Sequence, residues 1–147
     1  MRLTSYTDFS LRVLIYLALA PSRLPTIAEI AQRYGVSKAH LMKVAYNLGQ
    51  AGFIETVRGK NGGLRLARDA RTVTIGEVVR RTEPDMAVVV CFEDSPKTAC
   101  LIAPACRLKA KLGQARAAFL QVLDDCTLAE MAANREALTS LLSLQAS

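Results

Sequence analysis

The order of hydrophobic and polar positions predicts a mainly helical chain. Nearly every residue from Val13 to Ala20 is apolar, so a first helix from about Thr7 to Ala20 is expected to be buried in a core or a dimer interface. Apolar residues then recur three or four positions apart across residues 26–33 and 37–50, which is the period of helices that bury one face. Only two short runs, FIETV and LRLA, have the composition of strands. The expected fold class is therefore mainly α with a small β-hairpin.

Four helix starts are marked by their first residues. The tetrapeptides TIAE, TIGE and TLAE begin at Thr26, Thr74 and Thr127. They have the form of capping boxes, in which the threonine hydroxyl accepts a backbone N–H bond and the glutamate reaches back. A fourth helix is expected from Pro104 to about Asp125, because proline lacks the N–H that a first helical turn leaves unpaired.

Residues 26–66 have the order of a winged helix-turn-helix. A short helix ends at the tight turn Tyr34-Gly35-Val36, and Ser37 then caps a second helix that buries one apolar face. The two strands follow, joined by RGKNGG, whose Asn-Gly-Gly turn is expected to supply positive φ angles for a hairpin. A hairpin directly after a recognition helix is a wing.

Charge favours nucleic acid as the partner of this part of the chain. Residues 1–82 hold thirteen Lys and Arg against five Asp and Glu, a net charge of +8, whereas residues 83–147 hold six against eight, a net charge of −2. A basic surface can be merely solvated, and some winged helices bind only protein. Cations on a recognition helix and around a glycine-rich wing tip are nevertheless typical of binding to an operator in double-stranded DNA. The candidate DNA-binding residues are Ser37, Lys38, His40, Lys43, Arg58, Lys60, Asn61 and Arg65.

Three of the four cysteines, Cys91, Cys100 and Cys106, lie within sixteen residues. Their spacing is C-x8-C-x5-C, which is neither the C-x2-C pair of a zinc ribbon nor the four-cysteine spacing of a ferredoxin. On spacing alone, a metal or cluster site, a thiol redox switch, a zinc site and inert thiols all stay open. Cys106 is expected in the first turn of the helix that Pro104 begins, where the positive helix end stabilises a thiolate.

Cys126 differs from the other three cysteines. If residues 104–125 form one helix, Cys106 and Cys126 are about 30 Å apart at 1.5 Å per residue. Cys126 is therefore expected to be a small apolar residue at a helix junction.

The sequence disfavours a membrane protein and an enzyme. The apolar run Val13–Ala20 is too short to cross a bilayer, which needs about 20 residues, and no convincing cleavage site follows it. A cytoplasmic protein with no membrane partner is expected, and reduced thiols in that compartment argue against structural disulfides. A single His and the lack of a nucleotide-binding loop or nucleophile arrangement argue against catalysis.

Five segments form a specific combination: LTSYTDFSLRVLIYLA, YGVSKAHLMKV, LGQAGFIETVRGKNGGLRLA, IGEVVR, and the three cysteines ending in CRLK. Together they resemble the iron–sulfur winged-helix transcription regulators, and among these the repressors that sense nitric oxide. The likeness covers residues 1–130 and implies a homodimer built around the helix at 104–125. The implied organisation is a winged helix-turn-helix domain over 1–82, a cluster loop over 83–106, and a dimerisation helix with a C-terminal helix over 104–147.

The same resemblance implies a cofactor. Cys91, Cys100 and Cys106 would hold an iron–sulfur cluster, either 4Fe–4S or 2Fe–2S. The fourth ligand would be a carboxylate from the first helix of the partner subunit, which corresponds to Asp8. The residues alone also allow Asp8 to complement the helix dipole or to pair with Arg12 four positions on. The loop between Cys91 and Cys100 is longer than in the nitric-oxide-sensing members, so the cluster type stays open.

A fourth ligand that is not a thiolate would leave one iron open to a small diatomic molecule. The resemblance therefore implies a repressor that leaves its operator when nitric oxide reacts with the cluster. Loss of ligation would shift the two winged-helix units relative to their half-sites. A thiol-redox or cluster-supply-sensing repressor of the same fold is the alternative.

Overall fold

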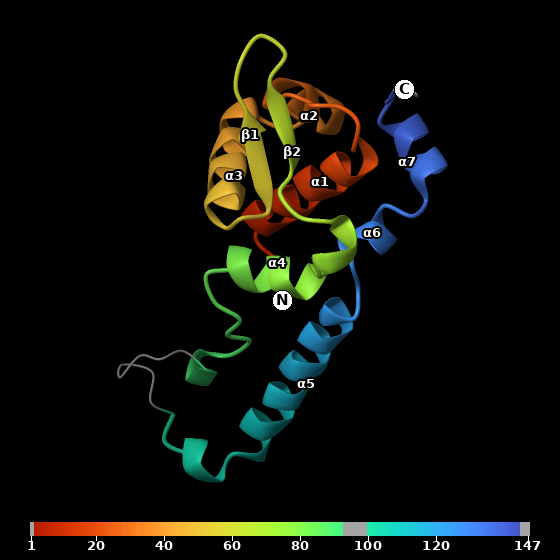
Figure 1. Cartoon of the computed structure of the whole chain (residues 1–147). Helices are drawn as coiled ribbons and strands as arrows, with labels where there is room; N and C mark the ends of the chain where they lie inside the picture. Colours follow the sequence, from red (N-terminus) through yellow and green to blue (C-terminus); the bar gives the residue numbers. More distant parts are fainter. Residues whose placement is uncertain (1, 93–99, 145–147) are drawn as a thin grey trace.

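The structure is a computed structural model that describes residues 2–92 and 100–144. One long helix, α1 (Ser5–Leu19), runs through the centre of the main body (Figure 1). Helices α3 and α4 and strand β2 contact it. The expected burial of the first helix is confirmed, and its buried apolar side chains include Val13, Leu14, Tyr16 and Leu17.

The helix-turn-helix consists of α2 (Ile27–Tyr34) and α3 (Lys38–Gln50). Gly35 ends α2 in the left-handed conformation with φ 63°, which glycine adopts without the steric cost that a Cβ adds. Ser37 is the N-cap of α3. The buried face of α3 is formed by Leu41, Val44, Ala45 and Leu48.

The wing is an antiparallel pair of strands, β1 (Ile54–Val57) and β2 (Gly63–Leu66), which pairs Ile54 with Leu66 and Val57 with Gly63. The hairpin is therefore confirmed. Its backbone is also tied to the body, because the Leu64 N–H donates to the Pro25 carbonyl at 2.9 Å.

The glycines of the wing loop act differently from the expectation. The positive φ angle falls at Gly59, with φ 118°, and Gly62 and Gly63 do not have positive φ angles. A Cβ at Gly62 would overlap the Val57 carbonyl oxygen, and one at Gly63 would overlap the Leu24 carbonyl oxygen. The adjacent glycines are thus needed for close backbone approach rather than for turn conformation.

The three Thr-x-x-Glu helix starts are confirmed as N-caps, at Thr26, Thr74 and Thr127. The full capping box forms at Thr127, whose N–H donates to Glu130 at 2.6 Å. The carboxylates of Glu29 and Glu77 instead bind arginines from other segments. The tetrapeptide identifies the helix start, but long-range partners decide where the glutamate points.

The long helix begins later than expected. Pro104 lies in a separate 3-10 turn, Ala103–Ala105, and Cys106 has extended backbone angles that separate this turn from α5 (Arg107–Asp124). Cys106 is thus the N-cap of α5 rather than a residue of its first turn. Helix α5 extends away from the main body, and only its C-terminal end lies next to α4 (Ile75–Thr82) (Figure 1).

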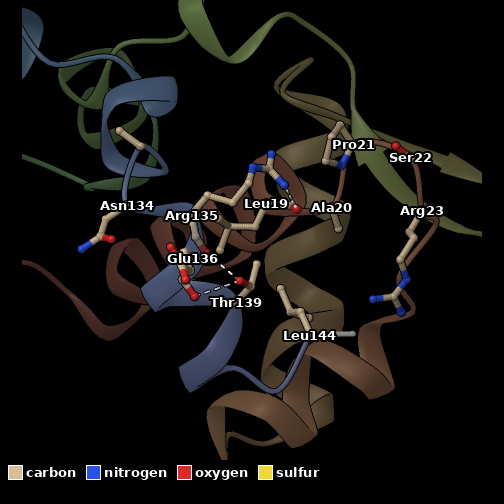
Figure 2. A pocket seen from close by; sticks show the side chains of 11 residues that line it. Leu19, Ala20, Pro21, Ser22, Arg23, Asn134, Arg135, Glu136, Thr139 and Leu144 are labelled. Carbon is tan, nitrogen blue, oxygen red and sulfur yellow. Dashed lines mark hydrogen bonds between the residues drawn. The ribbon is translucent and has the colours of Figure 1, made fainter. Parts of the chain in front are cut away.

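The C-terminal segment returns to the main body. Two short helices, α6 (Leu128–Met131) and α7 (Arg135–Leu141), follow α5. Figure 2 shows the Arg135 side chain reaching from α7 to the end of α1, where it donates to the Leu19 carbonyl at 2.6 Å beside a hollow of about 680 Å³. Within the described part of the chain, no helix is both long and apolar enough to cross a membrane.

Helices α1 and α2 are tied by a partly buried hydrogen-bonded group. The hydroxyl of buried Tyr16 donates to Glu29 Oε1 at 2.8 Å, and Arg23 donates to the same oxygen at 2.7 Å. Burial raises the pKa of Glu29, but the hydrogen bonds from Tyr16 and Arg23 outweigh it, so the pKa lies below its ordinary value. Burial and the bond to Glu29 raise the pKa of Tyr16 to about 12.

Replacing Glu29 by glutamine should reduce the acid dependence of stability. Because folding lowers the pKa of Glu29, its charge stabilises the fold above the unfolded pKa near 4.5, and this contribution is lost as the pH falls through the folded pKa. Glu29→Gln should therefore be less stable than wild type at neutral pH and lose less on acidification. Urea unfolding at neutral pH and below pH 4.5 measures this. An equal loss on acidification in both proteins would contradict it.

Candidate nucleic-acid interface and cysteine segment

The candidate DNA-binding residues of the helix-turn-helix are all exposed. Lys38, His40 and Lys43 lie on α3, and Ser37 precedes them with a hydroxyl that makes no cap hydrogen bond. His40 faces the start of α1, because its ring stacks on Phe9 with centroids 6.4 Å apart. The two lysines and Ser37 are therefore more open to a DNA groove than His40 is.

Two further residues of α3 were missed by the sequence reasoning. Met42 and Tyr46 are 54% and 68% exposed, although both are large and apolar in part. They lie opposite the buried face of α3, on the same side as Lys43. Their helical spacing from the buried residues already indicated that they are exposed. An exposed Met and Tyr on a recognition helix can contact thymine methyl groups or sugars.

The candidate DNA-binding residues of the wing are three cations and one neutral amide. Arg58, Lys60 and Asn61 are exposed in the loop between the strands. Arg65 is instead paired across the two strands with Glu55, with 2.7 Å between Arg65 Nη2 and Glu55 Oε2. Part of the Arg65 charge is thus already neutralised.

The cysteine segment, residues 91–106, approaches the middle of α5 through Phe92. Cys91 lies in the 3-10 turn η2 (Val90–Phe92), whose Phe92 ring is 4.9 Å from the Arg116 guanidinium of α5. Cys100 is exposed, and all four thiols are free. Residues 93–99 lie outside the described ranges. Among residues 2–92 and 100–144, no three His, Cys, Asp or Glu side chains are grouped to hold a metal ion.

Cys106 lies at the positive end of α5. Its Sγ accepts the Lys109 backbone N–H at 3.4 Å, as an N-cap side chain does. Cys126 lies at the junction between α5 and α6, where its thiol donates to the Val122 carbonyl at 3.2 Å. The two cysteines are at opposite ends of α5, so Cys126 is separate from the other three.

Asp8 is engaged within its own helix. Its carboxylate pairs with Arg12 at 2.9 Å, four residues on, and both side chains are nearly half exposed. The Arg12 guanidinium also lies 5.8 Å from the Tyr34 ring centroid. Helix α1 belongs to the main body, whereas residues 100–106 lead into the distant end of α5 (Figure 1).

Helix α5 carries an uncovered apolar stripe. Leu108 and Val122 are 64% and 63% exposed, and Ala115 and Ala118 are exposed between them. No residue of α5 is buried. A helix this long with no buried side chain is typical of one that packs against a second chain.

The charges of α5 oppose its helix dipole. Arg107, Lys109 and Lys111 lie near its N-terminus, and Asp124 and Asp125 lie at its C-terminus. A helix macrodipole favours acids at the first end and bases at the second. The arrangement therefore suits an external partner with complementary charge at each end.

Comparison with known proteins identifies the family. The model of the Rrf2 family, described as an iron-dependent transcriptional regulator, matches residues 3–134. The chain belongs to the Rrf2 family. The HTH-type transcriptional regulator NsrR of Bacillus subtilis (strain 168) is 51% identical over 146 residues, which are 99% of each protein. NsrR of Shouchella clausii (strain KSM-K16) is 47% identical over 146 residues, 99% of this chain and 97% of that protein.

Solved Rrf2-like structures agree with the fold. The global cysteine regulator CymR of B. subtilis matches with a TM-score of 0.73 and 27% identity, over 90% of this chain and 97% of that one. IscR of T. potens matches in fold with a TM-score of 0.72 and 24% identity, over 100% of this chain and 93% of that one. The resemblance to winged-helix regulators and the mainly α fold with a β-hairpin wing are confirmed, and this Rrf2 protein is an NsrR-like transcription regulator rather than an enzyme.

Proposed function

We propose that this Rrf2 protein is a dimeric repressor whose operator binding is controlled by an iron–sulfur cluster that reacts with nitric oxide. The observation that carries the proposal is the set of three free thiols in the segment that leads into α5, a helix whose other end joins the winged-helix body. The two relatives that are 51% and 47% identical are named as HTH-type transcriptional regulators NsrR, which supports a role in transcription regulation. The proposed setting is the cytoplasm, where thiols stay reduced.

The proposed operator contacts come from α3 and the wing. Ser37 and Lys38 at the start of α3 and Lys43 along it would enter the major groove, where helix N-termini and cations contact phosphates and bases. Met42 and Tyr46 would add apolar contact beside them. Arg58, Lys60 and Asn61 of the wing would contact the adjoining DNA backbone or minor groove. His40 and Arg65 would lie at the edge of this DNA-contact surface.

The charge of Arg58 should contribute more to DNA binding than that of Arg65, which already pairs with Glu55. Arg58→Ala should weaken binding to all sequences and reduce the slope of log K against log salt concentration by about 1. Arg65→Ala is the matched control in the same wing and should change the slope less. Titration of a selected operator at several salt concentrations measures both slopes, and equal changes would contradict the assignment.

The proposed dimer pairs two copies of α5 in antiparallel orientation. The two large residues of the stripe, Leu108 and Val122, each lie seven residues from Ala115. Antiparallel pairing about Ala115 would place Leu108 of each chain against Val122 of the other, with small alanines where the helices approach most closely. It would also place Arg107 near the acidic Asp125 end of the other copy, whereas parallel pairing would bring like charges together.

Disulfide trapping tests this register. A mixture of Leu108→Cys and Val122→Cys chains should form a cross-link between positions 108 and 122 under mild oxidation, identified by peptide mass spectrometry. Leu108→Cys alone should not cross-link 108 to 108, because antiparallel pairing separates these positions by most of the helix length. Ala117→Cys, exposed on the side of α5 away from the stripe, serves as the control that should not cross-link. Self-linking at position 108 would instead indicate parallel pairing.

The donor chemistry of the cysteine segment fits an iron–sulfur cluster. Soft thiolates are the ligands that such clusters prefer. Cys106 lies at the positive end of α5, where a thiolate is stabilised. We propose Cys91, Cys100 and Cys106 as ligands, and Asp8 of the partner subunit as the fourth. When bound, a 4Fe–4S or 2Fe–2S cluster would supply an iron that reacts with nitric oxide.

Asp8 would exchange partners between the two states. In the single chain its carboxylate is held by Arg12, so ligation requires that Arg12 release it. Loss of ligation would return Asp8 to Arg12 and free the cysteine segment from the partner subunit. The two winged-helix bodies would then no longer be held at the spacing of the operator half-sites.

Operator binding by anaerobically prepared protein tests the proposed function. At fixed salt, the cluster-loaded protein should bind tightly, and nitric oxide should weaken binding by about 5- to 150-fold, the usual range for coupled sites. Cys106→Ser should lack the response but keep its fold, because serine is also a good N-cap. Equal affinity before and after nitric oxide would exclude nitric oxide as the signal. A response to oxidants that persists without iron would favour the thiol-switch alternative, and a response to cluster loading alone would favour a sensor of cluster supply.

A further inference from the structure

Helix α5 has little to fix its direction relative to the winged-helix body. None of its residues is buried, and its partly buried apolar side chains are Leu112, Phe119, Leu120 and Leu123. Hydrophobic packing within the chain therefore holds it only weakly. Its main contact with the body is α4, at the end remote from Cys106 (Figure 1). The contacts at this one junction therefore decide how movement of α5 reaches the body.

An ion pair with two hydrogen bonds closes the junction. Arg80 of α4 donates through Nη2 to Asp124 Oδ2 at 2.6 Å, and its Nη1 binds Asp124 Oδ1. This bidentate arrangement fixes direction as well as distance. The bond from Arg80 also lowers the pKa of the Asp124 carboxyl.

A glycine at position 76 allows α4 and the end of α5 to approach each other closely. A Cβ at Gly76 would overlap the Asp124 carboxylate and lie 2.9 Å from the Asp124 backbone nitrogen. Gly76 is buried in the first turn of α4, as its second residue. The close approach of Asp124 explains why a side chain is absent here.

Two backbone hydrogen bonds extend the junction beyond the ion pair. The Ile75 N–H donates to the Cys126 carbonyl at 2.9 Å, and the Leu128 N–H donates to the Val73 carbonyl at 2.8 Å. They form an antiparallel bridge between Thr74 and Thr127. Leu128 is fully buried, so the chain just after α5 is anchored in the core.

We propose that Gly76, Arg80 and Asp124 form a clamp that makes α4 and α5 move as one unit, and that this clamp transmits the position of α5 to the operator-binding surface. Arg80 and Asp124 are thus positioning residues for operator binding, remote from DNA and from the cysteines. The inference rests on the proposed control of operator binding through the cysteine segment. An ion pair with side chains 46% and 32% exposed contributes little to stability, so its main effect is on geometry.

The test compares operator affinity in the cluster-loaded and nitric-oxide-treated protein at fixed salt. In Arg80→Gln and Asp124→Asn the ratio of the two affinities should fall to within about twofold of one, because the coupling between sites is lost. The visible spectrum of the loaded protein should not change, since the clamp is remote from the ligands. Arg81→Gln removes the same charge from the next position of α4, where the side chain is also exposed, and should keep the wild-type ratio.

A second readout needs no cluster. Amide hydrogen exchange at Ile75 and Leu128 should be faster in Arg80→Gln than in wild type or Arg81→Gln, because the bridge beside the clamp opens more often. If Asp124→Asn does not fold, Arg80→Lys replaces it. Lysine keeps the charge but cannot make the bidentate bond, so its affinity ratio should lie between those of wild type and Arg80→Gln.

The outcomes separate the two proposals. A wild-type ratio of one would overturn the proposed function, and the clamp's role with it. A large wild-type ratio that is unchanged in both Arg80 variants, with unchanged exchange at Ile75 and Leu128, would overturn the clamp alone. A ratio that falls equally in Arg81→Gln would show that charge on α4 matters and the clamp geometry does not.

Discussion

Helix α5 buries none of its own side chains, and the proposed assembly and signalling both follow from this feature. The winged-helix body around α1 is complete by itself, with a core that includes Tyr16 and Leu14. Helix α5 instead presents an apolar stripe and end charges that oppose its dipole. In the proposed dimer, a second copy of the chain covers the stripe and complements the end charges. The position of α5 would then be set by the partner at one end and by α4 at the other.

In the proposed mechanism, this arrangement would let a chemical event beside α5 affect distant DNA contacts. The cysteine segment packs on α5 through Phe92 and Arg116, and the far end of the helix is joined to α4, which contacts α1. Helix α1 in turn contacts α3 and the wing. A rigid helix with one stiff junction transmits displacement without unfolding the body, which is how packed interfaces commonly switch between states.

The sequence predicted those features that depend on local chemistry. Threonine caps, the Gly35 turn, the buried face of α3 and the hairpin all follow from residues a few positions apart. Features set by distant residues were not predictable in this way. The start of α5 shifted because Cys106 took an extended conformation after Pro104, and Gly76 and Asp124, 48 positions apart in the printed sequence, meet only in the fold. Met42 and Tyr46 could have been found from the helical period but were not among the predicted contact residues.

The central claim is that Cys91, Cys100 and Cys106 hold an iron–sulfur cluster that responds to nitric oxide. The most direct measurement is the iron and acid-labile sulfide content of anaerobically purified protein, with its visible spectrum before and after nitric oxide. We predict iron and sulfide in equal amounts, a visible absorption that nitric oxide changes, and loss of all three in Cys106→Ser. Wild-type protein without iron and sulfide, or a Cys106→Ser variant that keeps the full content and the same spectrum, would contradict the claim.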